Sequence, residues 1–236
     1  MEGRLLRVVP LAAAVILLGA ALLMVGCGSS SGRYRYIQAA TALPGTGNVD
    51  LQVDGKSVQT GIGFGQAMSY RSIGGGSHKF DVFAPGTTTN PYQESSISVG
   101  SYTTIFSAGQ FSNGQIPGAP VVFTDDNTVP TTGNARLRII HMSPTAGNVD
   151  IYIVSPPGTG LGGLNAQIPS LAYQVASQYQ TLGANSYDVV VTVAGTQVEL
   201  IRDSYTLTSE QVRTVVLLDS SLGGGPYSQL ILSDLN

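Results

Sequence analysis

Short runs in which hydrophobic and polar residues alternate with a period of two dominate the chain. Residues 49–53 read VDLQV, residues 80–84 read FDVFA and residues 187–193 read YDVVVTV. Successive side chains of a β-strand point to opposite faces, so this alternation places one set of residues on a buried face. Val, Thr and Tyr, which favour strands, are frequent in these runs. The pattern therefore predicts strands that are buried on one face.

Turn residues separate these runs. Gly, Pro, Asn and Ser interrupt the chain roughly every 10–15 residues, and Asp54-Gly55 is typical of a two-residue hairpin turn. Beyond residue 32, no segment carries a long hydrophobic stripe with the helical period of 3.6 residues. About seven short strands in roughly 100 residues favour a β-sandwich of immunoglobulin-like architecture. We therefore expect an all-β protein.

The runs are arranged as an internal duplication. Six segments of the first half match six segments of the second half in the same order: residues 33–38 and 136–141, 47–53 and 147–153, 70–74 and 179–183, 80–82 and 187–189, 102–106 and 212–216, and 123–127 and 232–236. Residues 128–134 read TVPTTGN, a composition typical of a linker. We therefore predict two tandem immunoglobulin-like β-sandwich domains, residues 33–127 and 135–236, each of ordinary domain size.

Composition supports a packed body and excludes one class of partner. Hydrophobic residues make up 42% of the 236 residues, which suffices for a core, while charged residues make up 11%, against about 25% in an average protein. The net charge is −3 and no dense patch of Lys and Arg occurs, so nucleic-acid binding lacks its electrostatic basis. Arg33 with Arg35 is matched by Arg136 with Arg138, and we expect both pairs to lie on a solvated strand face.

The first 32 residues have the layout of an export signal followed by a tether. Arg4 and Arg7 precede an uncharged apolar stretch, residues 8–25, as in secretory signal peptides. The next two residues complete the sequence LMVGC, which resembles the lipobox of bacterial lipoproteins. We expect residues 1–26 to be removed as a lipoprotein signal peptide and residues 27–32 to form a flexible tether. The alternatives are an uncleaved membrane helix and simple secretion.

Cys27 is the single cysteine of the chain, so the protein forms no intramolecular disulfide. The lipobox resemblance implies that Cys27 carries the lipid, whose acyl chains anchor the protein to the membrane. We therefore expect a lipid-anchored protein of the cell envelope. Gly28 rather than Asp follows Cys27, which favours the outer membrane if the organism is Gram-negative.

The second half carries a motif that is similar to a known family. Residues 136–144 read RLRIIHMSP and residues 148–152 read NVDIY, which resembles the opening of the bacterial and archaeal DUF4397 domain. The resemblance implies an extracytoplasmic domain, often in tandem and often carried on a lipoprotein, without established catalytic residues. In the first half, residues 38–40 depart from the motif and three residues are inserted before Gly47.

His141 and Ser143 are the candidate catalytic residues. They lie two positions apart and hence on the same face of a strand, and Asp150 would complete a Ser-His-Asp triad. The alternative, which we favour, is that both side chains bond locally and order the turn that follows. Gln38 and Ala40 are their counterparts in the predicted alignment, so a triad would not be shared by the two halves.

Acidic residues near the linker raise the question of a metal site. Asp125, Asp126 and Asn127 offer consecutive oxygen ligands of the kind that Ca²⁺ prefers, and other acidic residues could complete the set: Asp50, Asp150 and Asp203. The alternative is that these residues end a strand and begin a turn. We expect no cofactor, because the formal G-x-G-x-x-G match at residues 158–163 lacks the strand-to-helix context of a nucleotide site.

These features favour a non-enzymatic, membrane-anchored envelope protein that acts as a surface display, adhesion or binding module. The expected partners are the membrane, through a lipid on Cys27, and an envelope protein or glycan. Tyr92, Tyr102 and Tyr227 lie near expected loops, where a tyrosine supplies contact area with a polar tip. Two alternatives remain open, an envelope hydrolase centred on His141 and Ser143 and an accessory subunit of an envelope complex.

Overall fold

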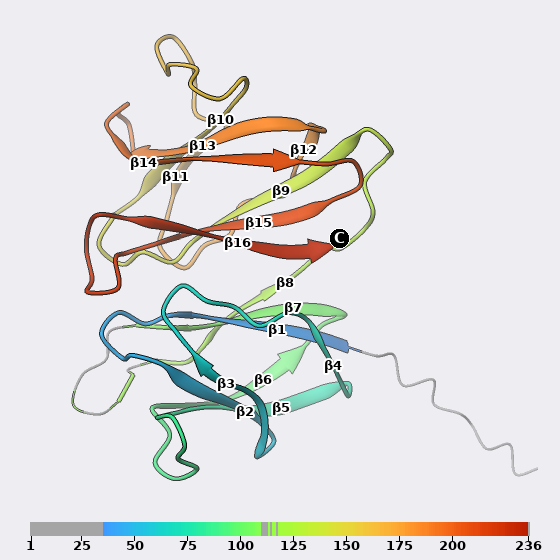
Figure 1. Ribbon diagram of the computed structural model, residues 1–236, viewed down its shortest axis with the longest axis vertical. Helices are drawn as coiled ribbons and strands as arrows, with labels where there is room; N and C mark the ends of the chain where they lie inside the picture. The colour runs from blue at the N-terminus through green and yellow to red at the C-terminus, as the bar shows by residue number, and fades with distance from the viewer. Residues whose placement is uncertain (1–34, 110–112, 114, 117, 236) are drawn as a thin grey trace, which may run out of the picture. The chain divides into compact units, whose positions relative to one another are not determined.

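The computed structural model describes residues 35–109, 113, 115–116 and 118–235. Every regular element within these residues is a β-strand, and the strands form two sandwich halves (Figure 1). The predicted all-β fold with two sandwich halves is therefore confirmed. In the described ranges, no helix is long and apolar enough to cross a membrane. The predicted signal peptide, Cys27 and the tether lie outside the described residues.

The first half is built from two four-stranded sheets. Sheet A has the strand order β4-β1-β7-β8 and sheet B the order β3-β2-β5-β6. The strands are β1 (Arg35–Ala42), β2 (Val49–Val53), β3 (Lys56–Ile62), β4 (Arg71–Ile73), β5 (Gly76–Phe83), β6 (Gln93–Val99), β7 (Tyr102–Ala108) and β8 (Val121–Thr124). All pairs are antiparallel except β1 with β7, which is parallel.

The second half repeats this topology strand for strand. Sheet A′ has the order β12-β9-β15-β16 and sheet B′ the order β11-β10-β13-β14, again with one parallel pair, β9 with β15. The strands are β9 (Asn134–His141), β10 (Val149–Val154), β11 (Ile168–Leu171), β12 (Gln180–Gly183), β13 (Asn185–Val193), β14 (Glu199–Leu207), β15 (Val212–Leu218) and β16 (Ser228–Leu235).

The pairing register corrects one block of the predicted alignment. Gln38 lies opposite Thr104 in the pair β1–β7, and Arg138 lies opposite Thr214 in the pair β9–β15. The counterpart of Arg138 is therefore Gln38, and the counterpart of His141 is Thr41. The sequence alignment matched alternating arginines, whereas backbone pairing fixes an offset of 100 residues without an insertion before Gly47.

Backbone pairing also corrects a second block of the predicted alignment. Phe80 of β5 pairs with Val53, and Val189 of β13 pairs with Ile153, so Phe80 corresponds to Val189 and not to Tyr187. The shift is two residues, which keeps each side chain on the same face of its strand. A period-two pattern therefore identified the strand and its buried face but left its register open.

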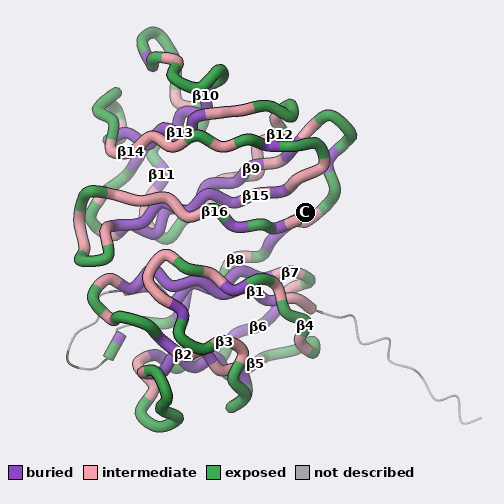
Figure 2. The backbone as a smooth tube through the Cα atoms, in the orientation of Figure 1, coloured by how far each residue is buried: buried purple, intermediate pink, exposed green. Residues whose placement is uncertain are grey.

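Each half has a hydrophobic core between its two sheets. In the first half the core gathers around Leu51, Phe80 and Ile105, and in the second around Ile139 and Val191, all essentially inaccessible to solvent. Figure 2 shows the buried positions along the central strands β1, β7, β9 and β15. Each fully buried side chain of this size contributes about 1.5–3 kcal/mol, so these two clusters supply the main stabilisation of the fold.

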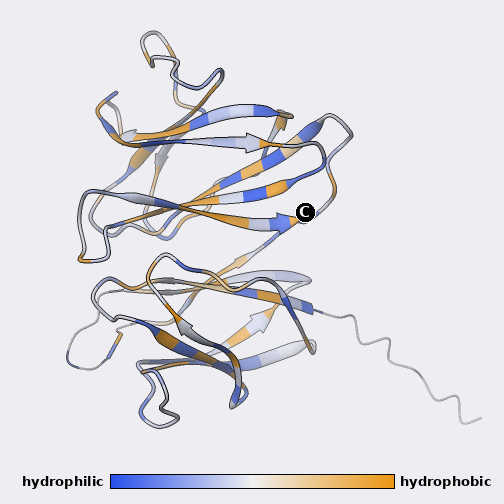
Figure 3. Ribbon diagram, viewed as in Figure 1, coloured by the Kyte–Doolittle hydropathy of each residue, from blue (hydrophilic) through white to orange (hydrophobic). Residues whose placement is uncertain are grey.

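The central strands β1, β7, β9 and β15 of sheets A and A′ are buried on both faces, which the alternation did not predict. Apolar side chains that point away from the two cores meet in a third cluster, which joins residues of both halves: Ala40, Ala42, Phe106, Ala108, Ile140, Met142, Val216, Leu218 and Leu232. Figure 3 shows hydrophilic and hydrophobic bands alternating along β9, which lies in this layer. The two halves therefore share a packed junction between sheets A and A′ instead of being separated by a linker alone.

Candidate functional site

His141 lies at the end of β9 and is completely buried. Its Nε2 is 2.7 Å from the carbonyl oxygen of Gly147, and its Nδ1 accepts a hydrogen bond of 3.3 Å from the backbone N–H of Ser143. Desolvation lowers the pKa of the imidazole, although the Gly147 carbonyl and nearby Asp219 act in the opposite direction. His141 is therefore a neutral ring, protonated on Nε2, that holds the turn after β9.

Ser143 bonds to a residue that the sequence analysis did not identify. Its hydroxyl donates to Asp219, a buried carboxylate at the end of β15 that also accepts from Thr145 Oγ1 at 2.9 Å. Asp219 further accepts from the backbone N–H of Gly224 at 3.1 Å. No motif in the sequence marks Asp219, because it lies 76 residues from Ser143 and only the parallel pairing of β9 with β15 brings the two together.

This geometry contradicts a catalytic triad. The Ser143 hydroxyl points to Asp219 and not to His141, and both side chains are inaccessible to solvent. Asp150 is engaged elsewhere, since it accepts from the backbone N–H groups of Ser170 at 2.7 Å and Gly195 at 2.8 Å. A hydrolase centred on His141 and Ser143 would need an accessible nucleophile next to its base.

The Asp150 arrangement has a counterpart in the first half. Asp50 accepts from the backbone N–H groups of Gly61 at 2.8 Å and Gly86 at 2.7 Å. Asp50 thus links the edge strand β3 to the connection between β5 and β6. Asp150 links the edge strand β11 to the turn between β13 and β14. The repeated sequence GNVD therefore has a structural role in both halves, because it satisfies backbone donors that lack a strand partner.

Asp125, the first candidate calcium ligand, belongs to a buried ion pair at the junction. Its Oδ1 accepts from Arg138 Nη2 at 2.6 Å, and its Oδ2 accepts from Tyr70 OH at 2.6 Å and Thr104 Oγ1 at 2.8 Å. The side chains of Asp125 and Arg138 are 0% and 3% exposed. Arg138 is therefore not on a solvated strand face as predicted, because sheet A′ packs against the first half there.

The equivalent contact on the other side of the junction uses an amide instead of a guanidinium. Gln38 Nε2 donates to Asp234 Oδ1 at 2.9 Å, and Asp234 Oδ2 accepts from Thr214 Oγ1 at 2.5 Å and Tyr179 OH at 3.0 Å. Burial raises the pKa of Asp234, although Arg138 partly counteracts it. The junction thus has approximate two-fold symmetry in its hydrogen bonds but not in its charge.

Asp126 and Asn127 point to other partners. Asp126 Oδ2 pairs with Arg136 Nη2 at 2.7 Å, and this pairing holds the pKa of Asp126 well below its usual range. Asn127 Nδ2 donates to the backbone oxygen of Asp234 at 2.5 Å. Within the described ranges, no three His, Cys, Asp or Glu side chains are grouped to hold a metal ion. The calcium hypothesis therefore receives no support from the geometry, and the three residues follow β8 and begin the connection to β9.

The largest difference between the halves is the connection after β2 and after β10. In the first half, Asp54 and Gly55 join β2 to β3. In the second half, residues 155–167 join β10 to β11 and fold over the outer face of sheet B′, where Leu161 packs on Tyr152. We call residues 155–167 the cover loop. It includes the G-x-G-x-x-G match, which forms a loop and lies next to no helix.

The hydrophobic pattern of β10 is a sequence signal for this cover. Residues 151–154 read IYIV, whereas residues 51–54 read LQVD. Tyr152 and Val190 on the outer face of sheet B′ are 4% and 0% exposed. A strand that is apolar on both faces is covered on both faces, so the loss of alternation in β10 predicts that something packs on its outer side.

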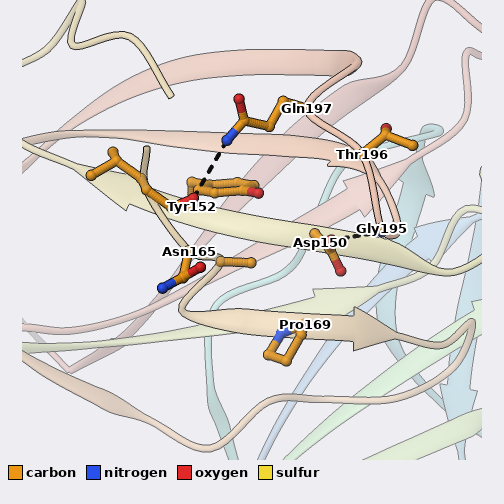
Figure 4. A pocket seen from close by; sticks show the side chains of 9 residues that line it. Asp150, Tyr152, Asn165, Pro169, Gly195, Thr196 and Gln197 are labelled. Carbon is orange, nitrogen blue, oxygen red and sulfur yellow. Dashed lines mark hydrogen bonds between the residues drawn. The ribbon is translucent and has the colours of Figure 1, made fainter. Parts of the chain in front are cut away.

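A groove lies between the cover loop and the turn that joins β13 to β14 (Figure 4). Its volume is about 660 Å³. Asn165 on the cover loop and Gln197 on the turn face the groove, and Tyr152 forms its inner wall. Gln197 Nε2 donates to the carbonyl oxygens of Leu161 at 2.9 Å and Leu164 at 3.4 Å. The groove is therefore a preformed concave surface of the second half.

The three tyrosines expected near loops have varied environments. Tyr102 stacks on Tyr36 with ring centroids 5.0 Å apart, and Tyr92 packs against the core of the first half. Tyr227 packs against the core of the second half. These rings therefore pack within the fold, and the concave surface next to Tyr152 is a better candidate for ligand contact.

Solved structures with a similar chain trace score low. A family 41 carbohydrate-binding module from streptococcal virulence factors, described for α-glucan recognition, is 12% identical over 84% of this chain and 97% of its own, with a TM-score of 0.29. A leucine-rich repeat protein from Bacteroides thetaiotaomicron is 13% identical over 77% of this chain and 26% of its own, with a TM-score of 0.22. Values this low establish neither fold nor ligand for the chain.

Comparison of the sequence with known proteins and family models identifies the family of the chain. No curated protein matches the chain. The family model described as a domain of unknown function, DUF4397, matches residues 35–152, which include all eight strands of the first half, strand β9 and the first part of β10. The match spans half of the chain and includes the GNVD segment of each half. The chain belongs to the DUF4397 family.

Proposed function

We propose that the protein is a non-catalytic binding module that is displayed on the bacterial cell envelope by a lipid on Cys27. The observation that carries the proposal is the contrast between two regions of the second half. His141 and Ser143, the candidate catalytic residues, are completely buried, whereas the groove beside Tyr152 is open and lined, apart from Asp150, by uncharged residues. A buried histidine and serine support a structural role, and an open groove supports binding.

The proposal includes two copies of the DUF4397 domain in tandem. The family model matches residues 35–152, and the second half repeats the strand order of the first. We retain residues 33–127 and 135–236 as the two copies, with residues 128–134 as the linker. The packed junction between sheets A and A′ supports two copies that act as one rigid body.

The anchor is tested by a change at Cys27. The full chain is expected to sediment with membranes and to incorporate an alkyne-labelled fatty acid, because lipidation requires the Cys27 thiol. The variant Cys27→Ser should lose the label and appear in the soluble envelope fraction. Label in the Cys27→Ser variant, or an unlabelled chain that sediments as before, would contradict the lipid anchor.

Binding without catalysis is tested on the purified protein. A panel of ester, peptide and glycoside substrates should show no turnover, and His141→Ala should change nothing in that panel. Crosslinking in intact cells followed by purification should retain a specific envelope protein or glycan. Turnover that disappears in His141→Ala would show that the protein is an enzyme and would overturn the proposal.

A further inference from the structure

We propose that the groove of the second half binds a neutral carbohydrate chain, an inference that rests on the proposed binding function and names its ligand. The groove lies between the cover loop and the β13–β14 turn, and the corresponding connection of the first half forms no cover loop, because Asp54 and Gly55 alone join β2 to β3. A volume of about 660 Å³ lies within the usual range of small-ligand sites.

The charge of the groove excludes an anionic ligand. None of its lining residues is Lys, Arg or His, and the single charged one is Asp150. Both carboxylate oxygens of Asp150 already accept backbone hydrogen bonds, from Ser170 and from Gly195. A phosphate or a carboxylate in the groove would therefore meet a negative group and no cation, which disfavours its binding.

The polar groups that remain suit hydroxyl groups. Asn165 is exposed, and its side chain forms no hydrogen bond within the described part of the chain. Gln197 is held by its Nε2, and its Oε1 points away from Tyr152 (Figure 4). An amide offers both donors and acceptors, so the side chain of Asn165 matches the hydroxyl groups of a sugar ring, which also donate and accept.

Apolar groups complete the site. Leu164 is 39% exposed at the edge of the groove, and Pro169 of β11 lies on the opposite side from the β13–β14 turn (Figure 4). Tyr152 is 4% exposed and forms the inner wall. The C–H faces of a sugar would pack on the exposed Leu164 and Pro169, while its hydroxyl groups bond to the amide of Asn165.

An extended peptide fits this groove less well. A peptide would add to β11, the edge strand of sheet B′, and would need its backbone N–H donors. Pro169 has no N–H, and the N–H of Ser170 is already bonded to Asp150 at 2.7 Å. Strand addition therefore lacks two successive donors beside the groove, which favours a carbohydrate over a peptide.

The test uses the full chain in detergent and an array of neutral and acidic oligosaccharides. The expected result is binding to neutral oligosaccharides alone, with one site per chain. Asn165→Ala should weaken binding about five- to tenfold, as expected for the loss of one hydrogen bond in a neutral site. Asn165→Trp should abolish it, because the indole fills the groove. Neither variant should shift the thermal midpoint, because Asn165 makes no internal hydrogen bond.

The matched control is Gln115→Ala, which removes an exposed amide from the first half and should leave binding unchanged. Absence of binding to every neutral oligosaccharide, or preference for acidic ones, would overturn the inference. Neutral-sugar binding that persists in Asn165→Trp would also overturn it, while leaving the proposed binding function in place. A labelled peptide library that binds the full chain and is released by Asn165→Trp would assign the groove to peptides instead. Failure of the lipid anchor is read separately, from the Cys27→Ser fractionation.

Discussion

The two halves of the molecule share a fold but differ in three places. The strand order, the parallel pair and the aspartate of the GNVD segment are the same in both. The halves differ at the junction, in the connection that follows β2 or β10, and in the buried cluster around His141. The shared features are those that a sandwich needs in order to fold. The features found in one half alone are the candidates for a specific function.

The outer faces of sheets B and B′ show this most clearly. Gln52 and Asp81, which are paired, occupy the outer face of sheet B, whereas Tyr152 and Val190, which are also paired, occupy that of sheet B′. The apolar face is covered by residues 155–167, and the cover creates the groove. A small change in side-chain polarity on one face thus accompanies an inserted loop and a new concave surface.

Among the substitutions that test the comparison of the two halves, one at Arg138 in the junction should have the largest effect on stability. Arg138→Met leaves the buried carboxylate of Asp125 without its cation, and removing one partner of such a pair costs about 3–5 kcal/mol. Urea unfolding followed by circular dichroism should report this loss. Since Arg138 belongs to the second half and its partner to the first, we also expect the single transition to separate into two.

Gln38→Met is the matched control on the other side of the junction. Gln38 Nε2 donates to both Thr104 Oγ1 and Asp234 Oδ1, and Asp234 would keep the hydroxyl donors of Thr214 and Tyr179, so the loss should be about 2 kcal/mol, that of two neutral donor contacts. Equal losses for Gln38→Met and Arg138→Met would contradict the view that the ion pair, and not shape alone, joins the halves.

Leu161, the buried residue of the cover loop, tests how the β10–β11 connection differs from the short β2–β3 connection. Leu161→Ala should destabilise the second half by about 2 kcal/mol, at the low end for a buried leucine because the small cluster can relax. The same change at Leu222, which is 91% exposed, should cost almost nothing. Similar unfolding free energies for the two variants would mean that the cover loop is not anchored by Leu161.

A smaller effect should appear in the pH dependence of stability, since Thr41 replaces His141 in the first half. The folded pKa of His141 lies below 6.5 because burial penalises the imidazolium, so the unfolded chain takes up its proton first. The unfolding free energy is therefore undiminished above pH 6.5 and falls as the pH decreases from 6.5 toward the folded pKa. Thermal midpoints of wild type and His141→Gln should diverge in that window, and parallel curves would contradict the assignment.

The smallest effect is expected for the charge of Asp126, which pairs with Arg136. The carboxylate of Asp126 is 55% exposed, so solvent and salt screen the pair. Asp126→Asn, which keeps an acceptor for the backbone N–H of Thr128, should cost about 0.5 kcal/mol or less. The difference should disappear in 0.5 M or higher salt, roughly where the screening length falls below 5 Å. A loss as large as that of Arg138→Met would mean that the two ion pairs act as one network.

Several features of the fold could be predicted from the sequence because they depend on local rules. The alternation in residues 49–53 places Val49, Leu51 and Val53 in the core, and the Asp54-Gly55 signal marks the hairpin between β2 and β3. The duplication of GNVD marks equivalent positions, since both aspartates bind backbone amides. Local backbone geometry and the period of a strand suffice for each of these predictions.

The candidate site could not be predicted in the same way. The sequence predicts Arg138 in solvent and offers Asp125 only as a turn residue or a candidate calcium ligand, yet the two bond to each other at 2.6 Å because two sheets pack face to face. Ser143 meets Asp219 because β9 and β15 are parallel neighbours, although 76 residues separate the two. A two-residue slip of register is invisible to a period-two pattern, because it keeps each side chain on the same face, and backbone pairing alone removes it.

The sequence by itself thus determined the class of this protein: strands, their buried faces, a duplicated order and membership motifs of its family. The tertiary structure decided what the polar residues do, because the partner of a buried charge is set by contacts between residues far apart in the chain. The difference has a physical reason. Hydrophobic burial depends on the pattern along one strand, whereas a hydrogen bond requires two particular atoms within about 3 Å, and only the packed fold brings them together.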